Sequence, residues 1–390
     1  MLKRNSLKHL ISLKSKTIIG LNSGTSADGV DAAVIRISGN GFTSKIEYIA
    51  GATYKFNPKM RTRILHYAEP EFHDGVKWLE LDLQLAKAFS KAAKKIARKA
   101  GLSMADIDLI GSHGQTIRHL PYNEYGPITY QIGDPGRIAV LTGTTTVGDF
   151  RIADVSAGGQ GAPLTPIVNA ILFSRLKKPY AILNIGGIAN ISVISGRGRG
   201  VDLVGADTGP GNMLVDYLIQ KLYGKNYDKN GRIAANGRLN QLLINKILSV
   251  GFLKRKGVKS AGREDFGRAF AEDFLNRCRK AKMANADIIA TASELTTSAV
   301  AKFIAMNKLK FNMLLLTGGG AQNSYFIDSL KRLLPGVEIK RVSDYNYPED
   351  YLEAISFAIL ANEAICSNKY NLKDVTGSRK MVVAGKICQA

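Results

Sequence analysis

Residues 17–37 read TIIGLNSGTSADGVDAAVIRI. Two apolar runs, residues 18–21 and 32–35, flank a polar turn, and their length and branched side chains are typical of buried strands. In the turn, residues 22–29, glycines let backbone N–H groups approach an anion closely, and hydroxyl groups add further donors. The stretch therefore predicts a strand–turn–strand unit that holds a phosphate. An ordinary hairpin with a Ser/Gly-rich turn is the alternative.

Two acidic side chains stand at the end of this turn and just after it. Asp28 and Asp31 can hold a cation, directly or through water. The turn is not a Walker A loop, because the pattern GxxxxGK[ST] does not occur in the sequence.

A second stretch repeats the pattern. Residues 180–193 read YAILNIGGIANISV and predict another pair of strands, joined by a turn at Gly186 and Gly187. Two such hairpins, one in each half of the chain, indicate a duplicated architecture with a nucleotide between the halves. An apolar strand over residues 313–317 then runs into three glycines, a loop that lets the backbone approach a flat or phosphorylated ligand. A plain glycine turn is the alternative there.

The composition is that of a globular chain with a large core. The 390 residues are 45% apolar and 22% charged and include 39 glycines, and this length predicts two or three domains. The net charge of +22 favours anionic partners such as nucleotides and anionic sugars. The basic residues are dispersed and seldom alternate with aromatic ones, so we expect no nucleic-acid partner.

The three cysteines lie far apart in the sequence and form no CxxC pattern, which fits a reducing compartment and predicts a cytoplasmic protein. No apolar run reaches the roughly 18 residues that span a bilayer, so we expect no membrane partner. Residues 1–16 are basic and lack the apolar segment of a signal peptide, and they predict a solvated tail. A basic targeting or surface segment is the alternative.

Candidate substrate contacts follow a predicted helix over residues 76–99. A short strand at residues 108–111 leads into a predicted polar turn at residues 112–116. Ligands of α/β sheets bind at such carboxyl ends of strands, so His113, Gln115 and Thr116 are candidates. A histidine that only stabilises the loop is the alternative.

A charged cluster precedes a glycine-rich loop at residues 158–164. Asp149, Arg151 and Asp154 follow a predicted threonine-rich strand over residues 142–147. Such a cluster can support acid–base chemistry or anion binding. Alternatively, Arg151 pairs with one of the aspartates and holds the loop.

Two further carboxylates are predicted near helix starts. Asp207 stands in GADTGPGN, just ahead of a predicted helix over residues 213–222, where a carboxylate either caps the helix or serves a site. Glu353 stands near the start of a predicted helix over residues 347–366.

Taken together and in order, these motifs resemble those of the anhydro-N-acetylmuramic acid kinase family over about residues 18–385. The resemblance rests on GLNSGTSADGVD, GSHGQTIRH, QIGD, GDFRIADVSAGGQGAPL, NIGGIANIS, ADTGPGNMLVD, LLLTGGG and EDYLEAISFAIL. It implies an α/β fold of two ribonuclease-H-like domains, of the actin and sugar-kinase type, around an interdomain ATP cleft. We expect the domains at residues 17–178 and 179–390, with the final helix returning to the cleft.

The resemblance implies an ATP-dependent kinase that opens the 1,6-anhydro ring of anhydro-N-acetylmuramic acid with water and phosphorylates O6, giving N-acetylmuramate 6-phosphate in peptidoglycan recycling. A levoglucosan-type anhydrosugar kinase and a non-catalytic nucleotide-binding regulator are the alternatives. The reaction logic implies Mg²⁺, with ligands unknown, and the family implies a homodimer whose ligands are the small-molecule anhydrosugar and ATP.

The resemblance also assigns roles to Asp207, to Glu353 and to the ATP-binding segment at residues 24–31, and the other contacts named below come from the local patterns described above. Asp207 matches the general base, and Glu353 matches a sugar-pocket glutamate. The predicted substrate contacts are His113, Gln115, Thr116, Asp154 and Glu353. The predicted nucleotide contacts are Gly24, Thr25, Ser26, Ala27, Asp28, Gly29, Val30, Asp31, Gly186, Gly187, Asn190, Gly318, Gly319 and Gly320.

The sequence departs from the family pattern at two positions. Asn22 stands where methionine is usual, and Ala261 stands where threonine is usual, so a hydroxyl group is lost. Neither departure is expected to touch the predicted site residues.

Overall fold

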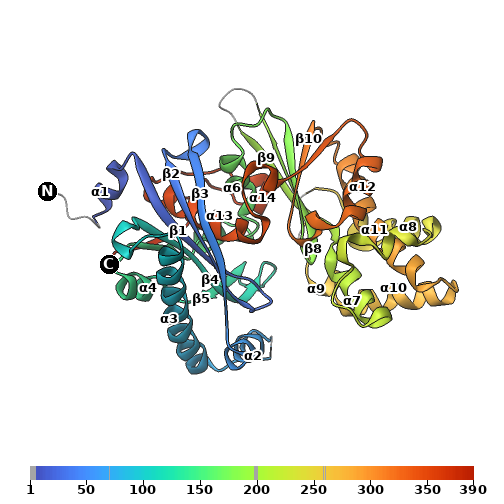
Figure 1. Cartoon of the computed structure of the whole chain (residues 1–390), viewed down its shortest axis with the longest axis horizontal. Coiled ribbons are helices and arrows are strands. Elements are labelled where there is room, and N and C mark those ends of the chain that lie inside the picture. The colour runs from blue at the N-terminus through green and yellow to red at the C-terminus, as the bar shows by residue number, and fades with distance from the viewer. Residues whose placement is uncertain (1–5, 70, 197–200, 258, 260) are drawn as a thin grey trace. The chain divides into compact units, whose positions relative to one another are not determined.

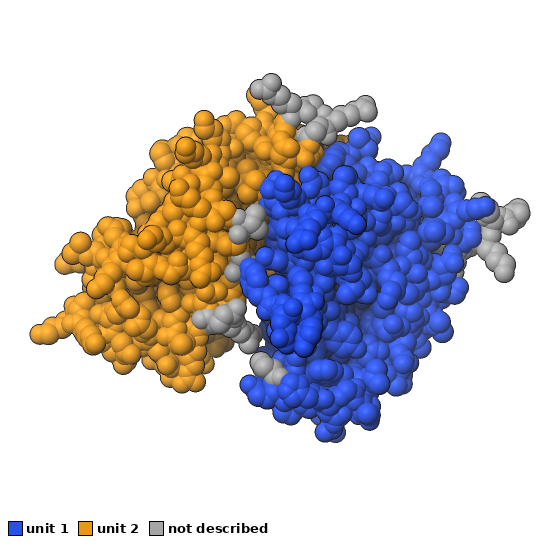
Figure 2. Space-filling model, turned by 180° about the vertical axis from the view of Figure 1, so that it is seen from behind, with its two compact units in different colours: residues 1–174, 351–390 blue, residues 175–350 orange. Residues whose placement is uncertain are grey.

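The computed structural model describes residues 6–69, 71–196, 201–257, 259 and 261–390, leaving aside the side chains of residues 263 and 264. The chain divides into two compact units (Figures 1 and 2). Unit 1 comprises Met1–Ser174 and Tyr351–Ala390, and unit 2 comprises Arg175–Asp350. Each unit is built on a β-sheet of its own, which confirms the expected α/β class with two domains.

The sheet of unit 1 contains the opening hairpin. Its strands β1 and β2 are antiparallel with a continuous register from Ser15↔Ser38 to Asn22↔Asp31, as the apolar runs predict. β3 continues the antiparallel part, while β4 and β6 add parallel strands on the other side of β1. The strands are β1 (Ser15–Ser23), β2 (Gly29–Ser38), β3 (Lys45–Lys55), β4 (Leu109–Leu120), β5 (Ile128–Ile132), β6 (Thr146–Gly148) and β12 (Lys386–Cys388).

Helices cover both faces of this sheet. Because successive side chains along a strand point to opposite faces, Ile19 and Leu21 of β1 share a core with α3 (Gly75–Lys99), whereas the intervening Gly20 faces α13 (Leu352–Ile365). The predicted helix over residues 76–99 is thus confirmed. The other helices of unit 1 are α1 (Leu7–Ser12), α2 (Pro58–Tyr67), α4 (Pro135–Thr142), α5 (Ile152–Ser156), α6 (Thr165–Leu172), α14 (Lys373–Thr376) and the 3-10 turns η1 (Gly41–Thr43) and η2 (Met104–Asp106).

α13 lies very close to the sheet because two neighbouring strands carry glycine beneath it. A Cβ atom on Gly20 would stand 1.7 Å from the carbonyl oxygen of Ala354, and one on Gly111 would stand 2.0 Å from that of Phe357. No side chain fits at either position without moving the helix. This close packing fixes the N-terminal turn of α13, which carries Glu353.

Unit 2 repeats the strand arrangement of unit 1, with three antiparallel strands followed by two parallel ones. The second predicted hairpin is confirmed, and with it the duplicated architecture. The strands, in the order β11-β10-β7-β8-β9, are β7 (Tyr180–Ile185), β8 (Ile188–Ser195), β9 (Asp202–Pro210), β10 (Met313–Thr317) and β11 (Glu338–Arg341).

The longest helix of unit 2, α11 (Asn285–Met306), is a core helix. Its length and composition would allow it to cross a membrane, yet 78% of its apolar 18-residue segment is buried inside the protein. The remaining helices are α7 (Asn212–Tyr223), α8 (Gln241–Leu248), α9 (Arg263–Phe266), α10 (Arg268–Lys280) and α12 (Ser324–Leu333). The 3-10 turns are η3 (Lys229–Gly231), η4 (Ala234–Asn236), η5 (Gly251–Lys254), η6 (Gly319–Gln322), η7 (Val342–Tyr345) and η8 (Glu349–Tyr351).

Two local predictions are wrong. The polar turn expected at residues 112–116 is part of β4, because β5 pairs with the second half of that strand from Gln115↔Ile132 to Leu120↔Ile128. The strand expected over residues 142–147 begins only at Thr146, since α4 extends to Thr142.

The structure also departs from expectation at both chain ends. Tyr351–Ala390 belongs to unit 1 and not to the C-terminal unit, because α13 packs on β1, β2 and β4. Within the expected N-terminal tail, α1 buries Leu10 to 1% exposure, so this segment is docked. Residues 1–5 of that tail lie outside the described residues.

Candidate functional site

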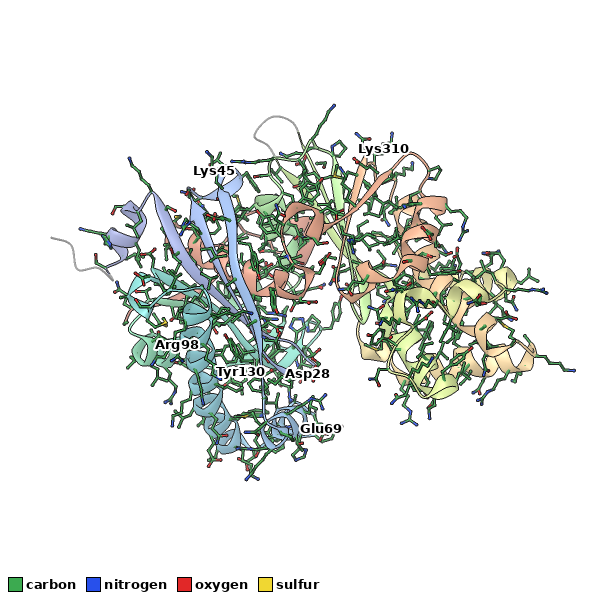
Figure 3. The ribbon with its side chains drawn as sticks, viewed as in Figure 1. Asp28, Lys45, Glu69, Arg98, Tyr130 and Lys310 are labelled. Carbon is green, nitrogen blue, oxygen red and sulfur yellow. The ribbon has the colours of Figure 1, made fainter. Side chains whose placement is uncertain are left out.

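The turn between β1 and β2 presents its small polar residues to solvent. Thr25, Ser26 and Asp28 are exposed, and the amide of Ala27 donates to the carbonyl of Gly24 at 3.1 Å. Asp28 lies at the base of this turn (Figure 3) and accepts from Nε of Arg61 at 3.0 Å. Of the eight nucleotide contacts predicted in residues 24–31, five are at least partly accessible, namely Gly24, Thr25, Ser26, Asp28 and Asp31.

The other three residues of this run are buried. The side chains of Ala27 and Val30 belong to the core beneath the sheet, and Gly29 packs against the backbone of β3. Only their backbone groups could face a ligand. Asp31 is half-buried and accepts from Oγ1 of Thr53 at 2.6 Å.

Gln115 supports this turn from β4. Its Oε1 accepts from Oγ of Ser23 at 2.6 Å, and its Nε2 donates to the carbonyl of Gly24 at 3.2 Å. The side chain is 1% exposed, so both ends of the amide are used to fix the end of β1. Thr116, the next residue, is half-buried and accepts from Nε2 of Gln131 at 3.4 Å.

A charged cluster in unit 1 brings together residues from four distant segments. Nδ2 of Asn22 donates to Oε2 of Glu353 at 2.6 Å, and Nε of Arg151 donates to Nε2 of His113 at 3.1 Å. The ring of His113 lies against Phe357 of α13, with ring centroids 4.5 Å apart. The sequence separation of these residues explains why local patterns did not predict their contacts.

Burial sets the protonation of this cluster. It lowers the pKa of His113 well below its ordinary value, and the positive charge of Arg151 lowers it further. It also lowers the pKa of Arg151 to about 10, although Glu353 opposes this shift. At neutral pH, His113 is therefore neutral and Arg151 is a cation.

The carboxylate of Glu353 responds in the opposite direction. Removal from bulk water and the charge of Asp31 raise its pKa, while the hydrogen bond from Asn22 and the charge of Arg151 lower it. The contact with Asn22 corrects an expectation, because this departure from the family pattern does touch a predicted site residue.

Asp154 is placed differently from the prediction. Its carboxylate is 0% exposed, accepts from the amide of Gly161 at 2.8 Å and accepts from Oγ1 of Thr376 at 2.7 Å. A substrate has no access to it. The neighbouring Asp149 pairs with Lys386 at 3.5 Å and not with Arg151. The glycine-rich loop is thus held by Asp154 through the amide of Gly161, and not by an ion pair of Arg151 with an aspartate.

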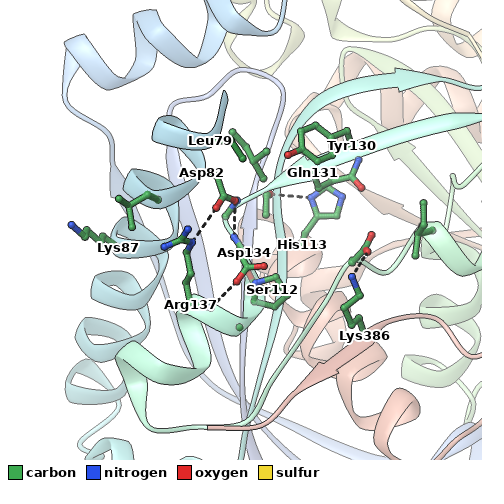
Figure 4. A pocket seen from close by; sticks show the side chains of 18 of the residues that line it. Leu79, Asp82, Lys87, Ser112, His113, Tyr130, Gln131, Asp134, Arg137 and Lys386 are labelled. Carbon is green, nitrogen blue, oxygen red and sulfur yellow. Dashed lines mark hydrogen bonds and ion pairs between the residues drawn. The ribbon is translucent and has the colours of Figure 1, made fainter. Parts of the chain in front are cut away.

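A cavity of about 840 Å³ opens beside this region of unit 1 (Figure 4). His113 lines it, together with residues of α3, β5 and α4, and an ion pair between Asp82 and Arg137 crosses its wall at 3.4 Å. Two buried polar atoms in the lining, Oγ of Ser112 and Oε1 of Gln131, have no hydrogen-bond partner within the described chain.

In unit 2, Asp207 lies on β9 beside a bulge. The pairing of β8 with β9 shifts between Ala189 and Asn190, so that Asn190 stands opposite Asp207 while Thr208 is skipped. Bulges of this kind change the direction of a side chain and occur near active sites. The helix-cap alternative is wrong, because α7 begins at Asn212 after Gly211 and without a side-chain cap.

The segment around Lys259 fixes both the backbone and the carboxylate of Asp207. The amide of Asp207 donates to the carbonyl of Lys259 at 2.9 Å, and Oδ2 of Asp207 accepts from the amide of Ala261 at 2.7 Å. Ala261, the second departure from the family pattern, therefore also touches a predicted site residue. Ser260, which stands between these two contacts, lies outside the described residues.

Lys259 is a buried cation that sequence patterns did not single out. It is 7% exposed, its Nζ donates to the carbonyl of Phe252 at 3.1 Å, and it lies over the rings of Phe252 and Phe303. Burial and the positive charges of Lys302 and Arg255 together lower the pKa of Lys259 to about 8, although the charge of Asp207 acts in the opposite direction. Its backbone is thus anchored next to the predicted base.

The second glycine turn and the triple glycine surround the end of β7. The carbonyls of Gly186 and Gly187 accept the first amides of α7, at 2.8 to 3.2 Å, so those amides are already satisfied. Gly318 has a φ of 77°, and a Cβ atom there would stand 2.4 Å from Asn184, whereas Gly319 is exposed. Gly320 is buried against Ile185.

A cavity of about 400 Å³ adjoins Gly319 in unit 2. Asn212 and Asp216 of α7 line it, together with the loop at residues 227–230. Burial raises the pKa of Asp216 to about 6. Within the described residues there is no group of three or more His, Cys, Asp or Glu side chains that could hold a metal ion.

The whole chain from residue 16 onward matches one protein family. A sequence model of that family, described as "Anhydro-N-acetylmuramic acid kinase", matches residues 16–390. A relative of the same name from Caldanaerobacter subterraneus subsp. tengcongensis is 37% identical over 98% of this chain and 99% of its own length. Another from Xylella fastidiosa is 40% identical over 95% of both chains.

Among solved structures, the (R)-2-hydroxyglutaryl-CoA dehydratase component A of Acidaminococcus fermentans matches 90% of this chain and 99% of its own, with 12% identity and a TM-score of 0.47.

Proposed function

The chain belongs to the anhydro-N-acetylmuramic acid kinase family, and we propose that it opens the 1,6-anhydro ring of its sugar with water while ATP phosphorylates O6. The product is N-acetylmuramate 6-phosphate. The family match over residues 16–390 supports the substrate and the kinase activity. The environment of Asp207 supports the hydrolytic step.

Asp207 is the general base in this proposal. Its carboxylate takes a proton from water, and the water oxygen forms a bond to C1 as the C1–O6 bond breaks. The electron pair released onto O6 attacks the γ-phosphoryl group, and ADP leaves with the electrons of the bond that joined it to that group. The proton is later released from Asp207 to solvent. The amide of Ala261, at 2.7 Å from Oδ2, holds the carboxylate in one orientation during these steps.

The nucleotide is assigned to the glycine-containing turns. The exposed hydroxyl groups of Thr25 and Ser26 and the exposed backbone of Gly319 are suited to phosphate and nucleoside contacts. The proposed contacts at Gly186, Gly187 and Asn190 remain predictions, and so does the cleft between the domains.

Magnesium is proposed on chemical grounds. Mg²⁺ is commonly held by one or two carboxylates together with substrate phosphates, and Asp28 and Asp31 stand beside the first turn in a way that fits this pattern. The ion would neutralise charge on the transferring phosphoryl group. The homodimer, the cytoplasmic location and the absence of nucleic-acid and membrane partners also remain predictions.

The experiment that tests the proposal compares three sugars. ADP release is measured with ATP and magnesium in the presence of 1,6-anhydro-N-acetylmuramic acid, N-acetylmuramic acid or levoglucosan. We expect turnover with the anhydro amino sugar and little with the other two. A preference for levoglucosan would change the substrate and keep the mechanism, whereas no turnover with any sugar would contradict the proposed function.

A further inference from the structure

Arg151 carries hydrogen-bond donors that the protein does not use. Its side chain is half-buried between β6 and α5, and within the described part of the chain its one hydrogen bond runs from Nε to Nε2 of His113. The terminal nitrogens, Nη1 and Nη2, have neither a hydrogen bond nor an ion pair with any described residue. Glu353 lies close enough to affect the pKa of Arg151, but the two are not among the ion pairs of the described residues.

A second inward-facing arginine of unit 1 shows the usual arrangement. Arg118 has its guanidinium over the ring of Trp78, 5.0 Å from the centroid, and both of its terminal nitrogens donate to backbone carbonyls. The accepting carbonyls belong to Tyr67, Ile117, Glu69 and Phe72. The terminal nitrogens of Arg151 are not among the buried polar atoms of the described residues that lack a partner, so solvent reaches them and an acceptor group of a ligand can replace water there.

His113 holds Arg151 in one orientation. Nδ1 of His113 lies 3.2 Å from the carbonyl oxygen of Gly114, and a carbonyl only accepts, so Nδ1 carries the proton and Nε2 accepts from Arg151. The ring is itself fixed against Phe357. With Nε occupied, the guanidinium can offer Nη1 and Nη2, a planar pair of nitrogens that matches the two oxygens of a carboxylate.

The nearby acidic groups are already engaged. Asp149 pairs with Lys386, Asp154 is bonded to Gly161 and Thr376, and Glu353 accepts from Asn22. These carboxylates therefore do not compete for Nη1 and Nη2, which stay open to a ligand, and the proposed substrate carries one carboxylate, on its lactyl group.

We propose that Arg151 binds the lactyl carboxylate of the anhydrosugar and so selects muramic acid over sugars without that group. This assignment rests on the proposed function. His113 is then a positioning residue, which acts on the substrate through Arg151. Arg151 contributes to binding and not to the bond-breaking steps, so its removal affects KM more than kcat.

The test combines two proteins with two sugars. The wild type and Arg151→Met are compared with 1,6-anhydro-N-acetylmuramic acid and with 1,6-anhydro-N-acetylglucosamine, which differs only by lacking the lactyl group. We expect Arg151→Met to lower kcat/KM for the first sugar about a hundredfold, mainly through KM, and to change it less than about threefold for the second. Arg151→Lys should restore part of the loss, and Arg36→Met, on an exposed ion pair, should change neither value.

The other outcomes would overturn either the assignment of Arg151 or the proposed function. An equal loss with both sugars, or no loss with either, would overturn the assignment, because the effect would not depend on the carboxylate. If Arg151→Met does not fold, the wild type alone decides, since equal kcat/KM for the two sugars would exclude carboxylate recognition. Wild-type protein that turns over neither sugar would overturn the proposed function, and the assignment of Arg151 with it.

Discussion

Asp207 offers the most direct test of a single side chain. Asn has the same shape and keeps an oxygen that accepts from the amide of Ala261, but it cannot take a proton from water. We expect Asp207→Asn to leave ATP binding nearly unchanged, by titration calorimetry, and to lower turnover by about 10²–10⁴-fold or more. Asp202→Asn, on the exposed start of the same strand, is the control. Unchanged turnover would move the role of base to another aspartate.

The hydrogen bond from Asn22 to Glu353 predicts that the pH dependence of kcat/KM shifts when Asn22 is replaced. Its amide stabilises the ionised form of Glu353 and so lowers a pKa that burial and Asp31 raise above the ordinary 4.5. Asn22→Met removes this bond, and the pKa of Glu353 then rises further. If ionised Glu353 binds the sugar, the acidic limb of kcat/KM should move to higher pH in this variant.

The measurement is kcat/KM as a function of pH for the wild type, Asn22→Met and Glu353→Gln. The last variant has no carboxylate at this position and should lose the part of the limb that Glu353 contributes, whereas the part that the base Asp207 contributes stays. An acidic limb that changes in Glu353→Gln but stays in place in Asn22→Met would contradict the assigned effect of Asn22.

Among the helices and strands, the contact of α13 with β1 is the least tolerant of change. A methyl group at Gly20 overlaps the backbone of Ala354, which a rotamer change cannot relieve. Gly20→Ala is expected to lower the free energy of unfolding by about 3 kcal/mol or more, measured by denaturant titration. Gly75→Ala is the control, because nothing lies within 4 Å of that position at the start of α3. Similar stabilities for the two variants would refute this packing.

The glycine-rich loop after α5 depends on Asp154. Asp154→Ala leaves the buried amide of Gly161 and the hydroxyl of Thr376 without an acceptor, and we expect a loss of about 2–3 kcal/mol in the free energy of unfolding. Thr376→Val removes one of the two bonds and should cost less. A folded Asp154→Asn variant should keep its KM for the sugar. A large rise in that KM would restore Asp154 as a substrate contact.

Local sequence patterns predicted those elements whose signal is local. Branched apolar runs around a polar turn identified both hairpins, and helical spacing identified α3 to within one residue. The extension of β4 beyond Gly111 was not predictable in this way, since it depends on pairing with β5. For the same reason, the place of Asp207 inside β9 follows from its pairing with β8 and not from the glycines that follow it.

His113 and Glu353 were named as candidates from the sequence, but their contacts with Arg151 and Asn22 were not predicted. Asn22, His113, Arg151 and Glu353 come from segments separated by up to 331 positions, and their hydrogen bonds arise only when the chain is folded. The burial of Lys259 could not be predicted from its sequence neighbours, since a lysine among polar residues usually lies on a solvated surface. A buried environment next to two aromatic rings is a tertiary feature.

For the protein taken together, the return of the chain end has the largest consequence. Tyr351–Ala390 closes unit 1, so Glu353, near the C-terminal end of the sequence, lies beside Asn22 near its start. The duplicated strand order of the two units explains why two similar hairpins occur in one sequence. The residues to which we assign roles lie in both units, Glu353 and Arg151 in unit 1 and Asp207 in unit 2.

The central claim is that one turnover joins hydrolysis at C1 to phosphorylation at O6. Mass spectrometry of the product formed from anhydro-N-acetylmuramic acid and ATP in H₂¹⁸O tests this directly. A short incubation and a parallel sample of unlabelled product correct for exchange at the anomeric carbon. We predict N-acetylmuramate 6-phosphate with one ¹⁸O on the sugar and none on the phosphoryl group. A phosphorylated sugar with its anhydro ring intact, or ¹⁸O in released inorganic phosphate with the sugar unchanged, would contradict the claim.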